Sequence, residues 1–406
     1  MSSQKETSTQ PSQPIQAPRH FPGFEGNWVR KELRPYLIQY QERVSADTDL
    51  RIYSSSRDGL LPQDEYYGGH NRLNDGEYGV VPNGYFVYRH MSDDTTFKFN
   101  VNNTGQPIAV SKEYPVFKTD GINPTFFRYL LNESVPFKKF AAMQRKGGTR
   151  TRLYFKTLCS WRAPLPNLAE QEQIADCLAS IDALIEAETE KLDALKDHKQ
   201  GLMQQLFPAE GESLPALRFP EFRSTSAWTE KAVSEVFEVT RGRVLAMSLV
   251  SETKTDEMKF PVYSSQTKRR GLCGYYSEYL YQDAITWTTD GAGAGDVNFR
   301  PGQFFCTNVC GVLLSKQGFA NPFMAALLNR RTRSHVSYHG NPKLMNGVMG
   351  DIMIPVPSLP EQQRISGFLV EMDSHIEHQE AKIEQLNHHK QGLLQQLFPV
   401  LDEVDG

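Results

Sequence analysis

Two stretches of the chain carry apolar residues at the spacing of a coiled-coil helix. In the first stretch, leucine and isoleucine recur alternately three and four residues apart, at Ile174, Leu178, Ile181, Ile185, Leu192, Leu195, Leu202 and Leu206. The second stretch repeats this spacing at Ile365, Leu369, Met372, Ile376, Ile383, Leu386, Leu393 and Leu397. Side chains three and four residues apart lie on one face of a helix. The pattern therefore predicts two long helices, each with an apolar a/d seam.

Polar residues interrupt both seams at the same two places. Glu188 and Lys199 stand in the first seam, and Gln379 and Lys390 stand at the matching positions of the second. A helix of about 37 residues is roughly 55 Å long, and Glu188 and Gln379 lie near the two midpoints. Antiparallel pairing would join them in one polar layer that fixes the register. We therefore predict an antiparallel coiled coil, and the alternative is two separate helices that each pack on their own domain.

The two helical stretches are copies of one sequence. Residues 170–208 and 361–399 align without a gap at an offset of 191, and 19 of the 39 positions are identical. The similarity continues upstream, where Pro164–Leu168 matches Pro355–Leu359 in its prolines and leucine. A repeat of this length indicates a duplicated unit. The chain is therefore read as a tandem duplication, with a globular domain and a long helix in each half.

The globular halves carry signals of both strands and helices. Residues 284–289 and 311–315 are β-branched and apolar stretches bounded by Gly, Pro or Asn, which is typical of strands. Asn123 and Asn321 each precede a proline, which predicts helix starts with asparagine as the N-cap. We therefore expect a mixed α/β fold with two globular domains, separated by two long helices in an antiparallel coiled coil, as a pseudo-twofold tandem repeat.

These patterns divide the chain into segments. The expected tails and linker are polar, which favours disorder at the N-terminus. The segments are a tail at 1–20, a first domain at 21–163, a spacer helix at 164–208, a linker at 209–216, a second domain at 217–354, a spacer helix at 355–399 and a tail at 400–406.

The composition is that of a globular protein. Apolar residues make up 39% and charged residues 23% of the chain. The apolar runs are far shorter than the ~20 residues of a membrane span, and the N-terminus lacks the apolar core of a secretory signal. We therefore expect a cytoplasmic protein with no membrane partner. Five cysteines without a CxxC pair argue against a disulfide framework and a metal site.

The motifs of common enzymes are missing from the sequence. It contains neither a GxxxxGK[ST] loop nor a GxGxxG turn, and the glycines of 291–295 are read as a loop. The Asn-Pro pairs at 123 and 321 lack the second proline of the amino-methyltransferase signature and are read as helix caps. No nucleophile–base constellation is evident. We therefore predict no catalytic, cofactor-binding or metal-binding residue, and favour a binding scaffold.

The distribution of charge points to nucleic acid. The net charge is only −4, yet residues 138–162 hold eight Lys/Arg and no carboxylate. Residues 259–277 and 318–350 each hold four unopposed Lys/Arg, whereas residues 170–197 hold nine carboxylates. Clustered cations attract DNA phosphates even where the net charge is small.

Two motifs, each present twice, carry a resemblance to a known family. Pro-x-Pro-x-Leu-x-Glu-Gln leads into each helix, at Pro164–Gln171 and Pro355–Gln362. Lys-x-Gly-Leu-x-Gln-Gln-Leu-Phe-Pro ends each helix, at Lys199–Pro208 and Lys390–Pro399. The chain thereby resembles the DNA-specificity subunits of type I restriction–modification systems. The resemblance implies a non-catalytic DNA-binding subunit, in which each target recognition domain reads one half of a bipartite site and the coiled coil sets the gap.

The resemblance also implies partners and cofactors. The expected partners are double-stranded DNA, two methyltransferase (modification) subunits and restriction/translocase subunits. S-adenosylmethionine, ATP and Mg would be bound by those partner subunits, and no cofactor is expected in this chain.

The basic blocks and the repeat alignment supply the candidate DNA contacts. Arg152 aligns with Lys343, and a cation kept in both halves suits a phosphate. Arg150 aligns with Asn341, and these side chains suit guanine and adenine edges respectively. The whole candidate set consists of polar residues in the same loops: Arg145, Lys146, Thr149, Arg150, Arg152, Gln266, Lys268, Arg269, Arg270, Tyr338, His339, Asn341 and Lys343.

The exposed faces and the C-terminal ends of the helices are candidates for docking the methyltransferase subunits. The end residues in question are Leu202, Leu206, Phe207, Leu393, Leu397 and Phe398. The alternative is that Phe207 and Phe398 close the helix ends against the neighbouring domain.

Two other functions stay open at this point. A protein-binding scaffold or adaptor is favoured by the acidic first helix and opposed by the basic blocks. A nuclease with an unrecognised site predicts metal-dependent cleavage of DNA by the purified chain alone.

Overall fold

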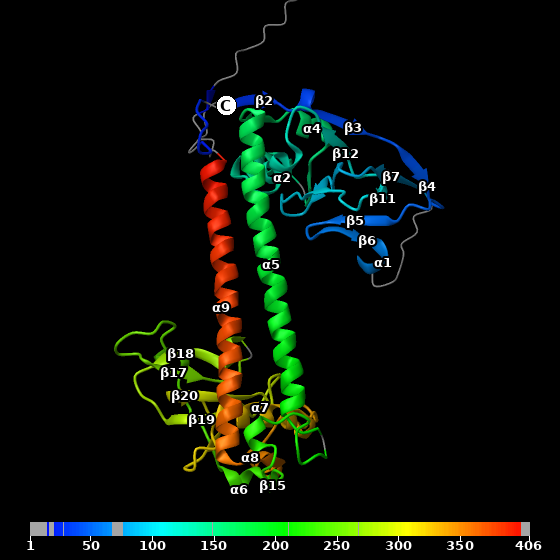
Figure 1. Ribbon diagram of the computed structural model, residues 1–406. Helices are drawn as coiled ribbons and strands as arrows, with labels where there is room; N and C mark the ends of the chain where they lie inside the picture. The colour runs from blue at the N-terminus through cyan, green and yellow to red at the C-terminus, as the bar shows by residue number, and fades with distance from the viewer. Residues whose placement is uncertain are drawn as a thin grey trace, which may run out of the picture. The chain divides into compact units, whose positions relative to one another are not determined.

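The computed structural model describes residues 14–15, 20–26, 28–66, 76–147, 149–209, 211–266 and 268–398 (Figure 1). The predicted tails therefore lie almost entirely outside the described residues. The chain divides into two compact units, of which the first comprises Met1–Glu188 with Lys382–Gly406 and the second Thr189–Ala381. Each unit contains a globular domain and one part of each long helix.

The globular domain of the first unit is built from short strands. One sheet has the order β1 (Pro14–Ile15), β2 (Trp28–Glu32), β14 (Arg162–Leu165). A second has the order β10 (Phe99–Val101), β8 (Phe86–Tyr88), β12 (Val116–Thr119), β3 (Leu37–Tyr40). A third has the order β4 (Arg43–Ser45), β7 (Glu77–Val81), β11 (Ile108–Ser111), β5 (Ile52–Ser56), β6 (Gly59–Pro62), and β9 (Met91–Ser92) pairs with β13 (Thr151–Arg152). The helices are α1 (Gln63–Tyr66), α2 (Pro124–Glu133), α3 (Val135–Met143) and α4 (Phe155–Cys159), with the 3-10 turn η1 (Arg34–Tyr36).

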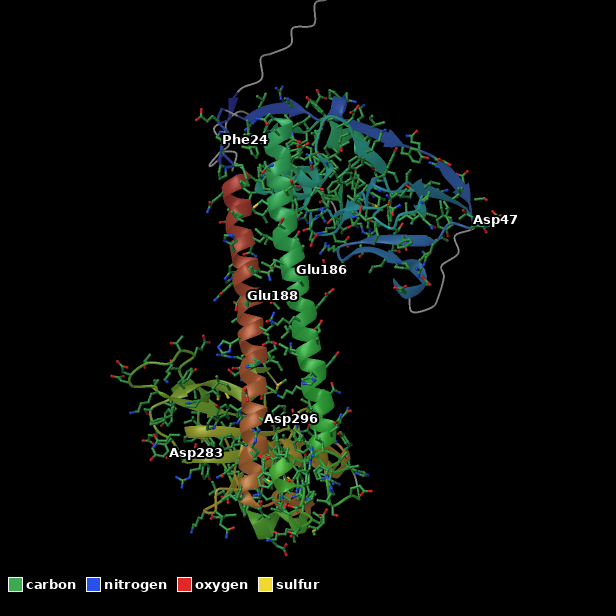
Figure 2. All side chains as sticks on the ribbon, viewed as in Figure 1. Phe24, Asp47, Glu186, Glu188, Asp283 and Asp296 are labelled. Carbon is green, nitrogen blue, oxygen red and sulfur yellow. The ribbon has the colours of Figure 1, made fainter. Side chains whose placement is uncertain are left out.

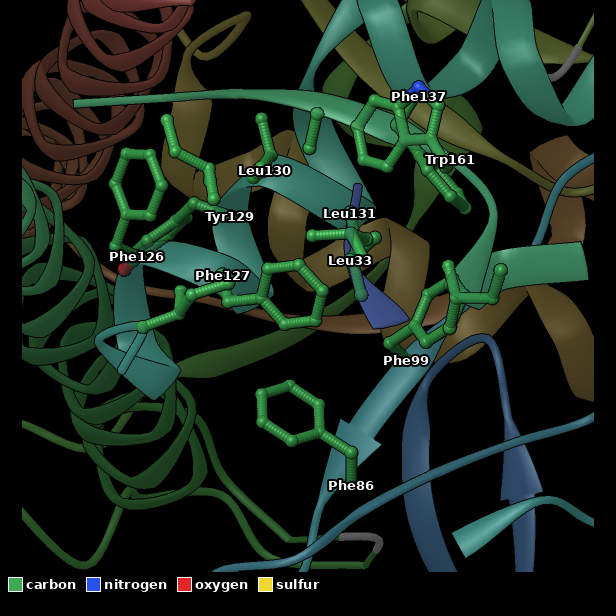
Figure 3. Close-up of a cluster of buried hydrophobic side chains, with 14 of the residues drawn as sticks. Leu33, Phe86, Phe99, Phe126, Phe127, Tyr129, Leu130, Leu131, Phe137 and Trp161 are labelled. Atoms are coloured by element: carbon green, nitrogen blue, oxygen red, sulfur yellow. The ribbon is translucent and has the colours of Figure 1, made fainter. Parts of the chain in front are cut away.

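The core of this domain is rich in aromatic rings. Figure 3 shows Phe126 and Phe127 of α2 in one cluster with Phe86, Phe99 and Trp161, which come from other parts of the chain. Phe86 and Phe127 meet edge to face, with ring centroids 5.9 Å apart. Burial of large rings is the main source of stability available to a domain of short strands.

The second unit contains a small and a large sheet. The small sheet pairs β15 (Thr229–Ala232) with β22 (Met353–Val356). The large sheet has the order β16 (Glu238–Arg241), β21 (Cys310–Leu314), β19 (Tyr281–Thr288), β20 (Val297–Cys306), β17 (Phe260–Tyr263), β18 (Leu272–Tyr276). The helices are α6 (Val233–Val236), α7 (Pro322–Thr332) and α8 (Asn346–Asp351), with the 3-10 turns η2 (Pro220–Phe222), η3 (Met247–Leu249), η4 (Lys268–Gly271) and η5 (Arg333–His335). The two predicted strands are confirmed as β19 and β21.

The predicted helix caps are confirmed in both domains. The Asn123 side-chain oxygen accepts a hydrogen bond from the Phe126 N–H at 3.0 Å, at the start of α2. Asn321 caps α7 in the same way, by accepting from the Met324 N–H at 3.0 Å. A proline follows each cap at the first helical position. Capping therefore accounts for the Asn-Pro pairs in structural terms.

The glutamates of the repeated motif tie each domain to its helix. Glu170 accepts a hydrogen bond from the Trp28 indole N–H at 3.4 Å in the first unit. Glu361 accepts one from the Trp228 indole N–H at 3.1 Å in the second. Glu361 also forms an ion pair with Arg218, at 2.7 Å from Nη2. These buried contacts give the repeated Glu a structural role.

The glutamines beside them fix the turn into each helix. Gln171 donates a hydrogen bond to the Pro166 carbonyl at 3.0 Å, and Gln362 donates to the Pro357 carbonyl at 3.0 Å. The Pro-x-Pro-x-Leu-x-Glu-Gln motif thus joins strand and helix, and the Glu–indole and Gln–carbonyl hydrogen bonds are the same in both halves.

The two long helices are α5 (Leu168–Leu206) and α9 (Leu359–Leu397), each of 39 residues (Figure 1). They begin four residues after the start of the predicted spacer segments, because Pro164 and Pro355 still belong to β14 and β22. In the described part of the chain, none of the helices combines the length and the apolar character needed to cross a bilayer.

Ion pairs between the helices define their direction. In the first unit, Asp182 pairs with Lys390 at 2.7 Å, and Glu188, labelled in Figure 2, pairs with Lys382 at 2.5 Å. In the second unit, Lys196 pairs with Glu380 at 2.7 Å. Residue numbers on α9 therefore fall as those on α5 rise. The antiparallel coiled coil is confirmed within each unit, against the alternative of two separate helices.

The lysines that interrupt the seams have partners on the opposite helix. Lys390 reaches Asp182 in the first unit, and Lys199 reaches Asp373 in the second. The two pairs are related by the 191-residue offset, so the break in one seam repeats the break in the other. The polar layer of Glu188 with Gln379 stays a prediction, since these residues belong to different units.

Candidate nucleic-acid interface

In the first domain, a short strand pair brings the predicted loop against a second one. β9 and β13 run antiparallel, with Thr151 opposite Ser92 and Arg152 opposite Met91. The chain before β13 therefore faces the chain after β9. The five candidates of this loop are all exposed: Arg145, Lys146, Thr149, Arg150 and Arg152.

An aspartate holds the candidate base-reading arginine of this domain. Arg150 Nε donates to Asp93 Oδ1 at 3.0 Å. The neighbouring Asp94 is occupied differently, since it accepts from the Thr96 N–H at 3.1 Å and the Ser92 hydroxyl at 2.9 Å. These hydrogen bonds, together with one from Arg57 Nη2 at 2.5 Å, lower the pKa of Asp94 to about 2. Asp94 thus shapes the loop, whereas Asp93 orients Arg150.

The second domain repeats this arrangement with a different side chain. The Asn341 amide donates to Asp290 Oδ1. Lys343 forms backbone bridges with Asp290 and with Ser337, which closes the loop. Asp290 lies just after β19, as Asp93 lies just after β9. The two aligned candidates, arginine and asparagine, are therefore each held by an aspartate from a neighbouring loop.

The remaining candidates of the second domain lie in two places. Tyr338 is 68% exposed and His339 is also exposed, both in the turn between the bridged residues 337 and 343. Gln266, Lys268, Arg269 and Arg270 lie between β17 and β18, and all four are exposed. In the part of the chain described, no recorded hydrogen bond or ion pair joins the two sets.

The β17–β18 loop faces the coiled coil within the second unit. Arg269 and Arg270 line an open cleft of about 570 Å³, and the helix residues that line it are Lys196, Lys199, Asp373, Ile376, Glu377 and Glu380. Two ion pairs link these helix residues, Lys196 with Glu380 and Lys199 with Asp373, so the charges within each pair already neutralise each other. The guanidinium groups of the loop are the cations of this cleft that have no recorded ion pair among the described residues.

Sequence reasoning missed the aspartates. Asp93 and Asp290 lie 57 and 51 residues before their partners, outside the basic blocks that supplied the candidate residues. It also missed Tyr154, an exposed ring that stacks on His90 with centroids 5.6 Å apart. Tyr154 follows Arg152 by two residues, so its position as an aromatic residue within a basic block could have marked it as a candidate DNA contact.

The candidate docking residues at the helix ends are mostly buried. Phe398 is 2% exposed, and its ring centroid lies 6.4 Å from that of Trp28. Phe207 is 1% exposed and stacks on Phe323 at 5.2 Å. Leu206 and Leu397 are buried as well, and Leu202 and Leu393 pack half-buried on the same cores. These contacts support the alternative in which the helix ends close against a domain, and they leave the exposed helix faces as the predicted docking surface.

Comparisons with known proteins identify relatives of the chain. It is 36% identical over 140 residues to a Mycoplasma pneumoniae protein described as the N-terminus of a type I specificity subunit, covering 34% of this chain and 73% of that protein. It is 32% identical over 141 residues to another specificity subunit described for that organism, covering 34% of this chain and 45% of that one. This second match therefore spans less than half of the relative's length.

Structural and family comparisons agree with these relatives. The crystal structure of the type I restriction–modification S subunit from M. genitalium matches with a TM-score of 0.63 at 15% identity, covering 96% of this chain and 100% of that one. The likeness shows a shared fold. A family model described as the type I restriction modification DNA specificity domain matches residues 92–197 and 225–388. The chain therefore belongs to the type I restriction–modification DNA specificity family.

Proposed function

We propose that this chain is a non-catalytic specificity subunit that binds DNA, with each recognition domain reading one half of a bipartite site. The observation that carries the proposal is the matched pair of loops, in which Arg150 is held by Asp93 and Asn341 by Asp290. The loops occupy equivalent positions of a tandem repeat, yet they present different hydrogen-bonding groups. A two-headed reader of an asymmetric site needs this combination.

Different residues of these loops would supply affinity for DNA and sequence specificity. Arg152 and Lys343 are the aligned cations, and we assign them to phosphates. Arg150 can donate two hydrogen bonds to guanine, and Asn341 can pair with the edge of adenine. A carboxylate beside each reader disfavours the approach of phosphate, because like charges repel. Asp93 and Asp290 would therefore bias the two side chains toward base edges.

The proposal extends to partners and cofactors. The exposed faces of α5 and α9 would dock two methyltransferase subunits, and restriction/translocase subunits would join that complex. S-adenosylmethionine, ATP and Mg would be bound by those subunits rather than by this chain. The complex would act in the cytoplasm, and the coiled coil would set the unspecified gap between the half-sites.

Methylation mapping tests this function. The chain is co-expressed with the methyltransferase subunit from the same source, and methylated adenines are mapped across the host genome. We expect a split motif with a fixed gap that is lost when the chain is omitted. A stable complex without any methylation would contradict the proposal, and metal-dependent DNA cleavage by the purified chain would favour the nuclease instead.

Substitution of the two readers is expected to act on separate halves of the motif. Arg150→Ala and Asn341→Ala should each weaken cognate binding by about 1–3 kcal/mol, since each removes one base contact. The mapped motif should become degenerate in one half only, and in a different half for each variant. Arg43→Ala is the matched control, because Arg43 is also an exposed arginine of the first domain paired with a carboxylate, Glu77, at 3.0 Å. Unchanged affinity and motif in both reader variants would remove these residues from the assignment.

A further inference from the structure

The β17–β18 loop has a strained backbone. Arg269 (φ 51°, ψ 35°) and Arg270 (φ 52°, ψ 35°) both adopt the left-handed conformation, and Gly271 follows with φ 87°. In this conformation the Cβ of an ordinary residue crowds its own backbone, so consecutive arginines there are unfavourable. Such strain persists only where the surroundings impose it, and it is concentrated at functional sites.

A buried arginine from the neighbouring strand contacts this loop at Arg270. Arg300 of β20 donates from Nη2 to the Arg270 carbonyl at 2.7 Å and from Nε to the Thr286 hydroxyl at 2.9 Å. Its guanidinium lies over the ring of Tyr263, 3.8 Å from the centroid. The planar guanidinium makes these three contacts at once, which an ammonium group cannot reproduce.

The position of Arg300 is unusual for a cation. The residue is 6% exposed, and burial lowers the pKa of its guanidinium. Within the described residues, its recorded partners are a hydroxyl, a carbonyl and a ring, none of them a carboxylate. A buried charge without a counter-charge is expensive, and an apolar residue would fill the same space more favourably. Stability therefore does not explain the choice of arginine.

A second contact holds the residue that follows Arg270. The Ser264 N–H donates to the Gly271 carbonyl at 2.9 Å. A Cβ built on Gly271 would lie 2.7 Å from the Ser264 carbonyl oxygen, so this close approach needs glycine. Lys268, Arg269 and Arg270 directly precede the residue held by this hydrogen bond, and all three are exposed.

We propose that Arg300 is a positioning residue that holds the Lys268–Arg270 loop in its strained form, and that this preformed loop contacts DNA at the half-site of the second domain. The inference rests on the proposed DNA-reading function. A loop that is ordered before binding loses less conformational entropy when DNA binds, so the clamp raises affinity without touching DNA.

Limited trypsin digestion tests the clamp without DNA. Trypsin needs a locally opened backbone as well as an exposed Lys or Arg side chain, so cleavage after Lys268, Arg269 or Arg270 reports opening of the loop. In the full-length chain, Arg300→Met is expected to raise cleavage within this loop by about tenfold or more, without a change in the thermal unfolding of the chain. Arg364→Met is the matched control, since Arg364 also lies over a ring, that of Phe219, but on the surface of α9. Unchanged cleavage in Arg300→Met would overturn the clamp.

Two milder variants keep the test decisive if Arg300→Met fails to fold. Thr286→Val removes only the hydroxyl that receives Nε, and it conserves volume in a buried strand position. Arg300→Lys keeps the positive charge but loses the planar fork. Trypsin is expected to cleave the loop faster in both variants than in the wild-type chain. Rapid cleavage of the Arg300→Lys variant would show that the loop is held by the geometry of the guanidinium rather than by its charge.

Methylation by the full complex tests the second step. Variants that free the loop are expected to weaken cognate binding by about tenfold, with degeneracy confined to the half read by the second domain. The inference would be overturned if both halves of the methylated motif became equally degenerate. It would also be overturned if the half read by the second domain stayed unchanged although trypsin cleaved the loop faster. A wild-type complex that methylates no split motif would instead defeat the proposed function, and the trypsin result would still decide whether Arg300 holds the loop.

Discussion

Replacing Glu361 with alanine is expected to lower the free energy of unfolding of the second unit by about 3–5 kcal/mol, because removal of one partner leaves a buried charge uncompensated. Glu361 accepts from Arg218 Nε at 2.8 Å and Nη2 at 2.7 Å, and from the Trp228 indole at 3.1 Å. The side chains of Glu361 and Arg218 are only 3% and 7% exposed. Alanine would remove the carboxylate that accepts from Arg218 Nε and from the Trp228 indole N–H, while, among the described residues, the Arg218 side chain would keep only its hydrogen bonds to Thr225.

Denaturant unfolding of the full chain, followed by tryptophan fluorescence, measures this loss. Glu371→Ala is the matched control, since it removes an exposed carboxylate from the same helix and should change stability by less than about 0.5 kcal/mol. The loss of unfolding free energy in Glu361→Gln should lie between the losses in Glu361→Ala and Glu371→Ala, because the amide oxygen still accepts one hydrogen bond. Equal effects of Glu361→Ala and Glu371→Ala would show that the buried pair contributes nothing.

The sequence predicted those features that depend on local or periodic patterns. The a/d spacing gave both long helices, and the Asn-Pro pairs gave the starts of α2 and α7. A helix face and a helix cap are each formed by residues within a few positions of one another, so spacing alone reveals them. The start of α5 was less accessible, because Pro164 belongs to a strand that pairs with β2 more than 130 residues earlier.

Contacts between distant segments were beyond sequence reasoning. Glu170 and Glu361 were read only as parts of a family motif, whereas their indole partners lie 142 and 133 residues away. The aspartates that hold Arg150 and Asn341 have no local signature either. Arg300 was overlooked for a further reason: it is an isolated cation inside a strand, outside every basic block. Its role follows from burial and geometry, which charge counting does not detect.

Inserting one heptad into each long helix is expected to lengthen the gap of the recognition motif by about three base pairs. Seven residues add about 10.5 Å to a helix, and successive base pairs are spaced about 3.4 Å apart. The insertions belong after Glu188 in α5 and after Ala381 in α9, where one compact unit passes into the other. A whole heptad preserves the phase of the a/d seam, so both units keep their own helix pairs.

The halves of the motif should stay unchanged, because the recognition loops are untouched, while the gap increases. The rate of methylation should fall, since three base pairs also turn the second half-site by roughly a third of a helical turn. Insertion into α5 alone is the control: it mismatches the seams and should abolish methylation rather than move the gap. Adenine methylation mapped for the double insertion gives the result directly. An active double-insertion complex with the original gap would show that the coiled coil holds the domains together without measuring the site, and would leave the spacing to the partner subunits.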